Sequence, residues 1–126
     1  MAGDSDLLFV YGSLLSGSSH PMAQQLAANA TLLGQAHIRG HRYRIDWYTG
    51  VVPSETAGTV VTGEVYRLYS PGTLLPVLDA YEEAEPWRGT DAEFRRELLP
   101  VELAAGGRLC CWVYSYNRPV IGLERI

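Results

Sequence analysis

Lysine is missing from this sequence of 126 residues, and all ten basic residues are arginine. This absence excludes Schiff-base chemistry through a lysine, including a lysine-anchored pyridoxal phosphate, and it removes the phosphate-binding lysine of a P-loop. Asp and Glu together number 14, and the ten arginines are scattered rather than clustered. The positive field that holds a phosphate backbone is therefore missing, and we expect no nucleic-acid partner.

The sequence also has no long apolar run. An acidic start, Met1 to Asp6, leads into only a brief apolar stretch, Leu7 to Tyr11, so the basic and apolar segments of a signal peptide are missing. No later run approaches the length that spans a bilayer. We therefore expect no membrane partner and a cytoplasmic location. The lysine-free, arginine- and alanine-rich usage suggests a GC-rich bacterial genome.

Cysteine is scarce, and its two residues, Cys110 and Cys111, are adjacent in an alternating apolar segment. Neighbouring side chains of a strand point to opposite faces, so the pair is unsuited to a structural disulfide. Two reduced, small side chains fit a reducing compartment.

Strand patterns dominate the chain. Its length and its 47% hydrophobic residues match one ordinary domain, and we expect a single domain over residues 1–126. Apolar runs bounded by glycine, proline and threonine predict strands over 7–11, 31–39, 40–47, 58–69, 94–103 and 108–116. The last two flank a glycine-bearing segment, Ala104 to Gly107, that is typical of a hairpin. A helix is predicted over about 21–29, with Pro21 near its first position.

A second helix is predicted over about 74–82. Apolar side chains recur there at three- and four-residue spacing, at Leu74, Leu75, Leu78 and Tyr81. Thr73 is the expected N-cap, which places Pro76 in the first turn, where its missing N–H costs little. Glu82 then falls at the C-terminal end of the helix.

The turn after the first strand is one candidate site. Gly12 lets the backbone bend sharply, which leaves successive amide N–H groups free to bind a carboxylate or an oxyanion without a charged side chain. A glycine in this place is also compatible with a tight turn and nothing more.

The acidic cluster Asp79, Glu82, Glu83 and Glu85 is the other candidate. Such clusters are commonly solvated helix faces. Glu82, however, follows Leu78 by one turn and so faces inward at a helix C-terminus, where burial, the helix dipole and neighbouring carboxylates all disfavour its ionised form. A carboxyl group with a raised pKa is suited to proton transfer near neutral pH.

Other motifs fail. Gly12 and Gly17 have P-loop spacing without the following lysine. His37 and His41 lie in a strand-like region where nothing completes a ligand set, so we expect no metal site. A triad of Ser13, a histidine and Asp79 lacks the nucleophile-elbow motif G-x-S-x-G.

Taken in order, the residues resemble the gamma-glutamylcyclotransferase-like family, in particular its AIG2-like branch. The resemblance covers nearly the whole chain and is carried by Phe9-Val10-Tyr11-Gly12-Ser13-Leu14, Gly40 with a Val51-Val52-Pro53 turn, Val61-Thr62-Gly63-Glu64-Val65-Tyr66, Leu78-Asp79-Ala80-Tyr81-Glu82, Phe94-Arg95-Arg96 and Trp112-Val113-Tyr114-Ser115-Tyr116-Asn117.

This resemblance implies an α+β fold, a small mixed β-barrel with a few short helices. It implies that the loop of Tyr11, Gly12, Ser13 and Leu14 binds a small gamma-glutamyl substrate, and that Glu82 is the general acid/base. The implied reaction is attack of the substrate's free α-amine on its own γ-carbonyl, which releases 5-oxoproline and an amine without a metal or organic cofactor. Tyr114 lines the pocket by resemblance, although a packed barrel interior explains it equally well.

Two departures from the family pattern affect these expectations. Glu83 stands where the family commonly has glycine, and Phe94 where it more often has tyrosine. Two further functions stay open: a noncatalytic small-ligand-binding protein of the same fold, and an unrelated hydrolase that uses Ser13. The sequence leaves undetermined the amine attached to the glutamyl group and the oligomeric state.

Overall fold

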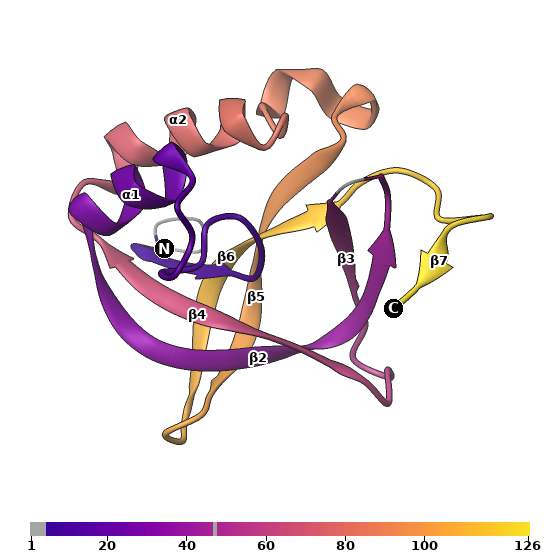
Figure 1. The fold of residues 1–126 in the computed structure, drawn as a ribbon, viewed down its shortest axis with the longest axis horizontal. Helices are drawn as coiled ribbons and strands as arrows, with labels where there is room; N and C mark the ends of the chain where they lie inside the picture. The colour runs from indigo at the N-terminus through magenta and orange to yellow at the C-terminus, as the bar shows by residue number, and fades with distance from the viewer. Residues whose placement is uncertain (1–4, 47) are drawn as a thin grey trace.

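A computed structural model describes residues 5–46 and 48–126 of the chain. Its strands close into a mixed five-stranded barrel, with neighbours in the order β2-β4-β1-β6-β5 and β5 pairing back onto β2 at Ala36↔Leu103 and His37↔Glu102. The β1–β6 pair is parallel and the other pairs are antiparallel. The barrel strands are β1 (Leu7–Val10), β2 (Ala30–Arg44), β4 (Val60–Leu68), β5 (Phe94–Leu103) and β6 (Arg108–Tyr116). The expected α+β barrel is thus confirmed (Figure 1).

One long strand, β2, replaces the two strands predicted over 31–39 and 40–47. It runs unbroken through Gly40, because a β-carbon there would lie 2.7 Å from the Val52 carbonyl oxygen, so only glycine lets β3 (Thr49–Pro53) pair at this point. The expected turn at Val51-Val52-Pro53 is wrong, since these residues belong to β3. Trp47, the last residue of the predicted strand, lies outside the described residues.

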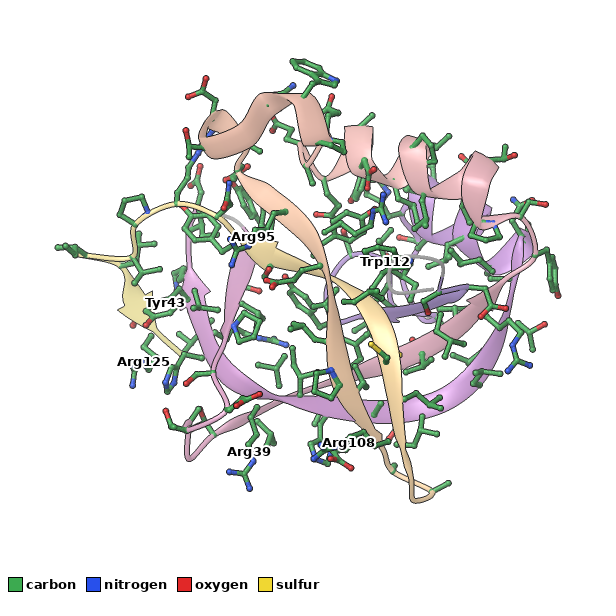
Figure 2. All side chains as sticks on the ribbon, turned by 180° about the vertical axis from the view of Figure 1, so that it is seen from behind. Arg39, Tyr43, Arg95, Arg108, Trp112 and Arg125 are labelled. Carbon is green, nitrogen blue, oxygen red and sulfur yellow. The ribbon has the colours of Figure 1, made fainter. Side chains whose placement is uncertain are left out.

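The short strand β7 (Glu124–Arg125) pairs with the end of β2 on the edge opposite β3, since both strands pair with Tyr43 and Arg44. Figure 2 shows Arg125 beside Tyr43, with its guanidinium carbon 5.8 Å from the centre of the Tyr43 ring. The two strands that lie outside the barrel therefore both use the C-terminal part of β2.

Two helices lie together on one side of the barrel, opposite the tip of the β5–β6 hairpin (Figure 1). The helix α1 (Pro21–Ala28) confirms the prediction, and the His20 ring caps it by accepting a hydrogen bond from the Met22 N–H at 3.0 Å. The helix α2 (Pro71–Tyr81) begins earlier than predicted, because Pro71 fits the first helical position.

That earlier start corrects two expectations. Ser70, not Thr73, is the N-cap of α2, and Pro76 lies inside the helix rather than in its first turn. The expected C-terminal end is confirmed, with Glu82 at the C-cap. A short 3-10 helix, η1 (Pro86–Asp91), then leads to β5 and was not predicted.

Alternation along the strands divides the core into two clusters. The first cluster contains side chains from all five barrel strands, including Phe9 and Val113. The second contains side chains from the alternate strand positions, including Leu8 and Tyr114, packed with helix residues such as Leu78. Cys111 belongs to the first cluster while Cys110 is exposed, so their expected opposite orientation is confirmed. Within the described residues, no helix has the length and apolar character that crossing a membrane requires.

Candidate active site

A cavity of about 440 Å³ opens where the loop after β1 meets the C-terminal end of α2. All of the site residues proposed from the sequence line it, together with residues from the start of β5 and from the segment before β3. The proposed ones are Tyr11, Gly12, Ser13, Leu14, Glu82 and Tyr114, and the additional ones include His20, Tyr48, Tyr81, Glu83, Glu93 and Phe94.

The loop after β1 presents backbone donors at this cavity. The N–H groups of Gly12, Ser13 and Leu14 have no hydrogen-bond acceptor in the described part of the chain. The loop is nevertheless fixed, because Leu15 N–H donates to the Gly12 carbonyl at 3.0 Å and closes the turn. Free amides at a fixed position match the predicted anion-binding loop.

Glu64 holds this loop against the barrel wall. Its carboxylate accepts hydrogen bonds from the Ser16 N–H at 2.7 Å and from the Ser16 hydroxyl at 2.6 Å. A β-carbon at the preceding Gly63 would lie 2.1 Å from the Val10 carbonyl oxygen, so glycine is required where β4 passes the end of β1. The sequence analysis did not single out Glu64, although a carboxylate inside an otherwise apolar strand pattern is a usable signal.

Glu82 lines the same cavity from the C-cap of α2. Its carboxylate makes no hydrogen bond or ion pair with the residues that the structure describes. Burial, and secondarily the negative charge of Glu93, raise its pKa from 4.5 to about 7. Both kinds of cause were expected from the sequence, but the interacting carboxylate comes from the segment before β5 and not from the helix.

Glu93 was missed by the sequence analysis. It is only 8% exposed, it lines the cavity, and one of its carboxylate oxygens accepts a hydrogen bond from the Tyr48 hydroxyl. Burial, followed by this bond, raises the pKa of Tyr48. The charged stretch from Glu82 to Asp91 concealed Glu93, because nothing in its spacing distinguishes a buried carboxylate from a solvated one.

Asp79 is buried behind the cavity rather than on a solvated face. Its carboxylate receives two hydrogen bonds from Arg96, at 2.8 and 3.1 Å, and one from the Tyr114 hydroxyl at 2.7 Å. Burial and this bond to Asp79 raise the pKa of Tyr114, which keeps its hydroxyl a neutral donor. Tyr114 therefore presents its ring, with an engaged hydroxyl, to the cavity.

Tyr11 is held in the same way. Its hydroxyl donates to the Tyr114 carbonyl, and burial, followed by the charge of Glu82, raises its pKa. Arg42 lies over its ring, 5.9 Å from the ring centre. Tyr11 and Tyr114 thus supply a rigid aromatic wall instead of a titrating group.

The structure does not arrange Ser13, a histidine and Asp79 as a catalytic triad. The Ser13 hydroxyl lies 2.6 Å from the Tyr81 hydroxyl, which lies 3.4 Å from Nε2 of His20. Asp79 is occupied by Arg96 and Tyr114 instead. Among the described residues, no group of three or more His, Cys, Asp or Glu is arranged to hold a metal ion.

The sequence model of the family described as "Gamma-glutamyl cyclotransferase, AIG2-like" matches residues 8–126. The chain belongs to this family. The gamma-glutamylcyclotransferase family protein YtfP of Escherichia coli K12 is 38% identical over 122 residues, which cover 94% of this chain and 89% of YtfP. The general class of this protein is therefore that of the gamma-glutamylcyclotransferase-like enzymes.

Several solved structures share the fold of this chain. The solution structure of YtfP from Escherichia coli has a TM-score of 0.61 at 35% identity, over 95% of this chain and 90% of that one. An aig2-like protein from Mus musculus has a TM-score of 0.72 at 21% identity, over 96% and 85% of the two chains. YkqA from Bacillus subtilis has a TM-score of 0.67 at 22% identity, and this chain, 89% of which is covered, spans only 36% of YkqA.

Proposed function

We propose that this AIG2-like protein is a gamma-glutamyl cyclotransferase, which converts a gamma-glutamyl amine or amino acid into 5-oxoproline and a free amine. One observation carries the proposal: Glu82, whose carboxylate has no partner among the described residues and a pKa of about 7, shares a cavity with the free amides of the loop at Gly12 to Leu14. A proton carrier and an anion-binding loop are the two groups that this reaction requires.

In this mechanism the amides of Gly12, Ser13 and Leu14 bind the α-carboxylate of the substrate. The rings of Tyr11 and Tyr114 limit the space around the glutamyl chain and hold it folded. Because the attack is intramolecular, such positioning supplies a large part of the acceleration. The substrate's own atoms then react without a covalent link to the protein.

Glu82 moves the proton. Its ionised carboxylate takes a proton from the substrate's α-ammonium, and the resulting amine nitrogen attacks the γ-carbonyl carbon. As the new C–N bond forms and the old one breaks, Glu82 returns this proton to the leaving nitrogen. The α-nitrogen loses a second proton as it becomes the lactam amide, and Glu82 passes that proton to the released amine as well, so the amine leaves as its ammonium. A pKa of about 7 suits a group that must first accept and then donate near neutral pH.

The test is release of 5-oxoproline from a panel of gamma-glutamyl amines and amino acids. Glu82→Gln keeps the volume of the side chain but cannot carry a proton, so we expect kcat to fall by about 10²- to 10⁴-fold. The matched control is Glu83→Gln, which removes the same charge from the adjacent, exposed residue. We expect that variant to stay within about tenfold of the wild type, because exposed carboxylates interact weakly.

The alternative function, a noncatalytic small-ligand-binding protein of the same fold, predicts a different result. Such a protein releases no 5-oxoproline from any member of the panel, with or without Glu82. Loss of turnover in Glu83→Gln that equals the loss in Glu82→Gln would also contradict the assigned role of Glu82.

A further inference from the structure

Three linked polar side chains line the cavity, and the mechanism above uses none of their side-chain groups. The Ser13 hydroxyl oxygen lies 2.6 Å from the Tyr81 hydroxyl oxygen, which lies 3.4 Å from Nε2 of His20. The His20 and Tyr81 rings also meet edge to face, with their centres 5.1 Å apart. The chain of contacts therefore joins the loop after β1 to the last residue of α2 and to the N-cap of α1.

The cap of α1 determines where the protons of this chain lie. Nδ1 of His20 accepts a hydrogen bond from the Met22 N–H at 3.0 Å, so Nδ1 carries no proton. A neutral imidazole then has its proton on Nε2, which must donate to the Tyr81 hydroxyl. The Tyr81 hydroxyl in turn donates to Ser13, since a phenol is a better donor than an aliphatic hydroxyl.

This arrangement leaves the proton of Ser13 available to a ligand. Among the residues that the structure describes, the Ser13 hydroxyl has no hydrogen-bond partner besides Tyr81. A serine nucleophile passes its proton toward a histidine that accepts it, whereas here the histidine donates. The direction of the chain therefore favours a donor role for Ser13 over the hydrolase in which Ser13 attacks.

A carboxylate is the ligand group that suits this donor. Ser13 belongs to the same loop as the three free amides, and a carboxylate offers about four acceptor sites, one more than those amides fill. Each hydrogen bond in a chain polarises the next, so donation from Tyr81 makes the Ser13 proton a stronger donor. Ser13 and His20 are exposed, so water competes for this bond and its expected contribution is modest.

We infer that His20 and Tyr81 are positioning residues, which orient the Ser13 hydroxyl as a donor to the α-carboxylate of the substrate. The inference rests on the proposed function, and it adds one side-chain donor and the two residues that direct it to the loop amides. No proton is transferred along the chain and no covalent bond changes. The chain therefore contributes to substrate binding and takes no part in bond breaking.

The kinetic experiment uses the best substrate of the gamma-glutamyl panel. We expect Ser13→Ala to raise KM about tenfold, because it removes a hydrogen bond to a charged group, and to change kcat by less than about twofold. Tyr81→Phe keeps the ring but not the hydroxyl, and we expect it to raise KM about threefold. A loss confined to kcat would place the Ser13 hydroxyl at the reacting carbonyl and overturn the inference.

The double variant tests whether Tyr81 acts through Ser13. Once Ser13→Ala has removed the oriented hydroxyl, Tyr81→Phe should cause no further rise in KM. A double variant whose KM rise is the product of the two single rises overturns the positioning role of Tyr81. Tyr69→Phe is the matched control, because it removes a tyrosine hydroxyl that lies 2.9 Å from the Thr31 hydroxyl, outside the cavity. We expect its KM to equal that of the wild type.

Two substitutions separate the role of His20 in the chain from its role as a cap. Asparagine is a favoured N-cap residue whose side-chain oxygen can accept from the Met22 N–H, but it is too short to reach Tyr81. We therefore expect His20→Asn to keep the urea midpoint of the wild type and to raise KM as Tyr81→Phe does. His20→Ala should lower the midpoint and raise KM as well. A KM that rises in His20→Ala alone would mean that the cap, and not the chain, is what matters.

Binding of 5-oxoproline, which retains the carboxylate, separates this inference from the proposed function. Calorimetry should show that Ser13→Ala and Tyr81→Phe raise its Kd by the same factors as they raise KM, with Tyr69→Phe unchanged. Turnover by the wild type with an unaltered KM in Tyr81→Phe overturns the inference and leaves the cyclotransferase function intact. No turnover of any panel member refutes the function, and the Kd values then decide the inference: equal Kd values in all variants, or no binding to the wild type, overturn it.

Discussion

At the scale of single residues, Glu82 acquires its chemistry from its surroundings. An exposed glutamate titrates near 4.5 and is a poor proton donor at neutral pH, whereas burial and the charge of Glu93 raise the pKa of Glu82 to about 7. Three tyrosines in the same cavity, Tyr11, Tyr48 and Tyr114, have raised pKa values as well, but their hydroxyls are bonded within the protein. Glu82 is therefore the group at the candidate site suited to exchange protons near pH 7.

This pKa sets the acid side of the pH–rate profile. Since Glu82 must be ionised to accept the substrate's proton, we expect kcat/KM to fall about tenfold per pH unit below pH 7. Glu93→Gln removes a negative neighbour, which lowers the pKa of Glu82 and moves this limb to lower pH. The gamma-glutamyl amide of pentylamine is the substrate for this measurement, because its leaving amine carries no second charged group.

The alkaline limb provides an internal control for that shift. It belongs to the α-amine of the free substrate, so it should not move between the wild type and Glu93→Gln. An acid limb that stays at the same pH in the variant would contradict the electrostatic coupling between the two carboxylates.

The raised pKa of Glu82 also lowers the stability of the folded protein as the pH rises. The folded pKa of about 7 exceeds the ordinary value of 4.5, so the stability linked to Glu82 is fully present below pH 4.5 and is lost as the pH rises through 7. Glu82→Gln has no such loss. We therefore expect this variant to be more stable than the wild type above pH 7 by roughly 1–3 kcal/mol.

Urea unfolding at pH 8 and at pH 4 measures the difference. The advantage of Glu82→Gln should be present at pH 8 and absent at pH 4. A variant that is less stable than the wild type at pH 8 would indicate that the carboxylate has a favourable partner in the folded protein.

At the scale of elements, the end of α2 explains a departure of this sequence from its family. Glu83 follows the C-cap and has a φ of +52°, a left-handed conformation in which glycine is free of the strain that a β-carbon causes. The family's usual glycine fits this conformation without strain. Glutamate here retains the backbone path, and with it the position of Glu82, at a local energetic cost.

A pair of substitutions measures that cost. Glu83→Gly and Glu83→Ala both remove the contact with Arg88, but only alanine keeps the β-carbon. We expect the glycine variant to be more stable than the alanine variant by about 1 kcal/mol in chemical denaturation. Equal stabilities would indicate that the backbone at this position relaxes out of the left-handed region in the variants.

At the scale of the whole molecule, one ion pair joins α2 to the barrel. Asp79 on α2 has a side chain that is 5% exposed and Arg96 on β5 one that is 18% exposed, and Tyr114 on β6 adds a third hydrogen bond. The guanidinium carbon of Arg96 also lies 4.2 Å from the centre of the ring of Trp112, which is labelled in Figure 2. This network keeps the C-terminal end of α2, and hence Glu82, against the cavity.

Asp79→Ala leaves the partly buried Arg96 without its partner, and we expect it to lower the free energy of unfolding by about 3 kcal/mol, the lower end of the range for a buried pair. The control is Glu102→Ala, which breaks a pair with Arg108 whose side chains are 41% and 68% exposed. That change should cost less than about 1 kcal/mol, because solvent screens the pair. Similar costs for the two variants in urea unfolding would contradict a structural role for the buried pair.

The sequence determined the local elements and the ends of the site. The alternation of apolar residues predicted both strands of the β5–β6 hairpin with the bounds that the structure shows. The three- and four-residue spacing of apolar residues placed Glu82 at the end of a helix. Both periods follow from strand and helix geometry alone. The free amides after β1 were also foreseeable, since a glycine after a buried strand allows the sharp turn that exposes them.

Contacts between distant segments were decided only by the tertiary structure. The continuation of β2 past Gly40 depends on β3, and Glu93 raises the pKa of Glu82 only because the segment before β5 folds back toward the end of α2. Asp79 was indistinguishable from its acidic neighbours until Arg96 lay beside it. Burial and charge pairing are properties of neighbours in space, whereas a sequence pattern reports neighbours along the chain.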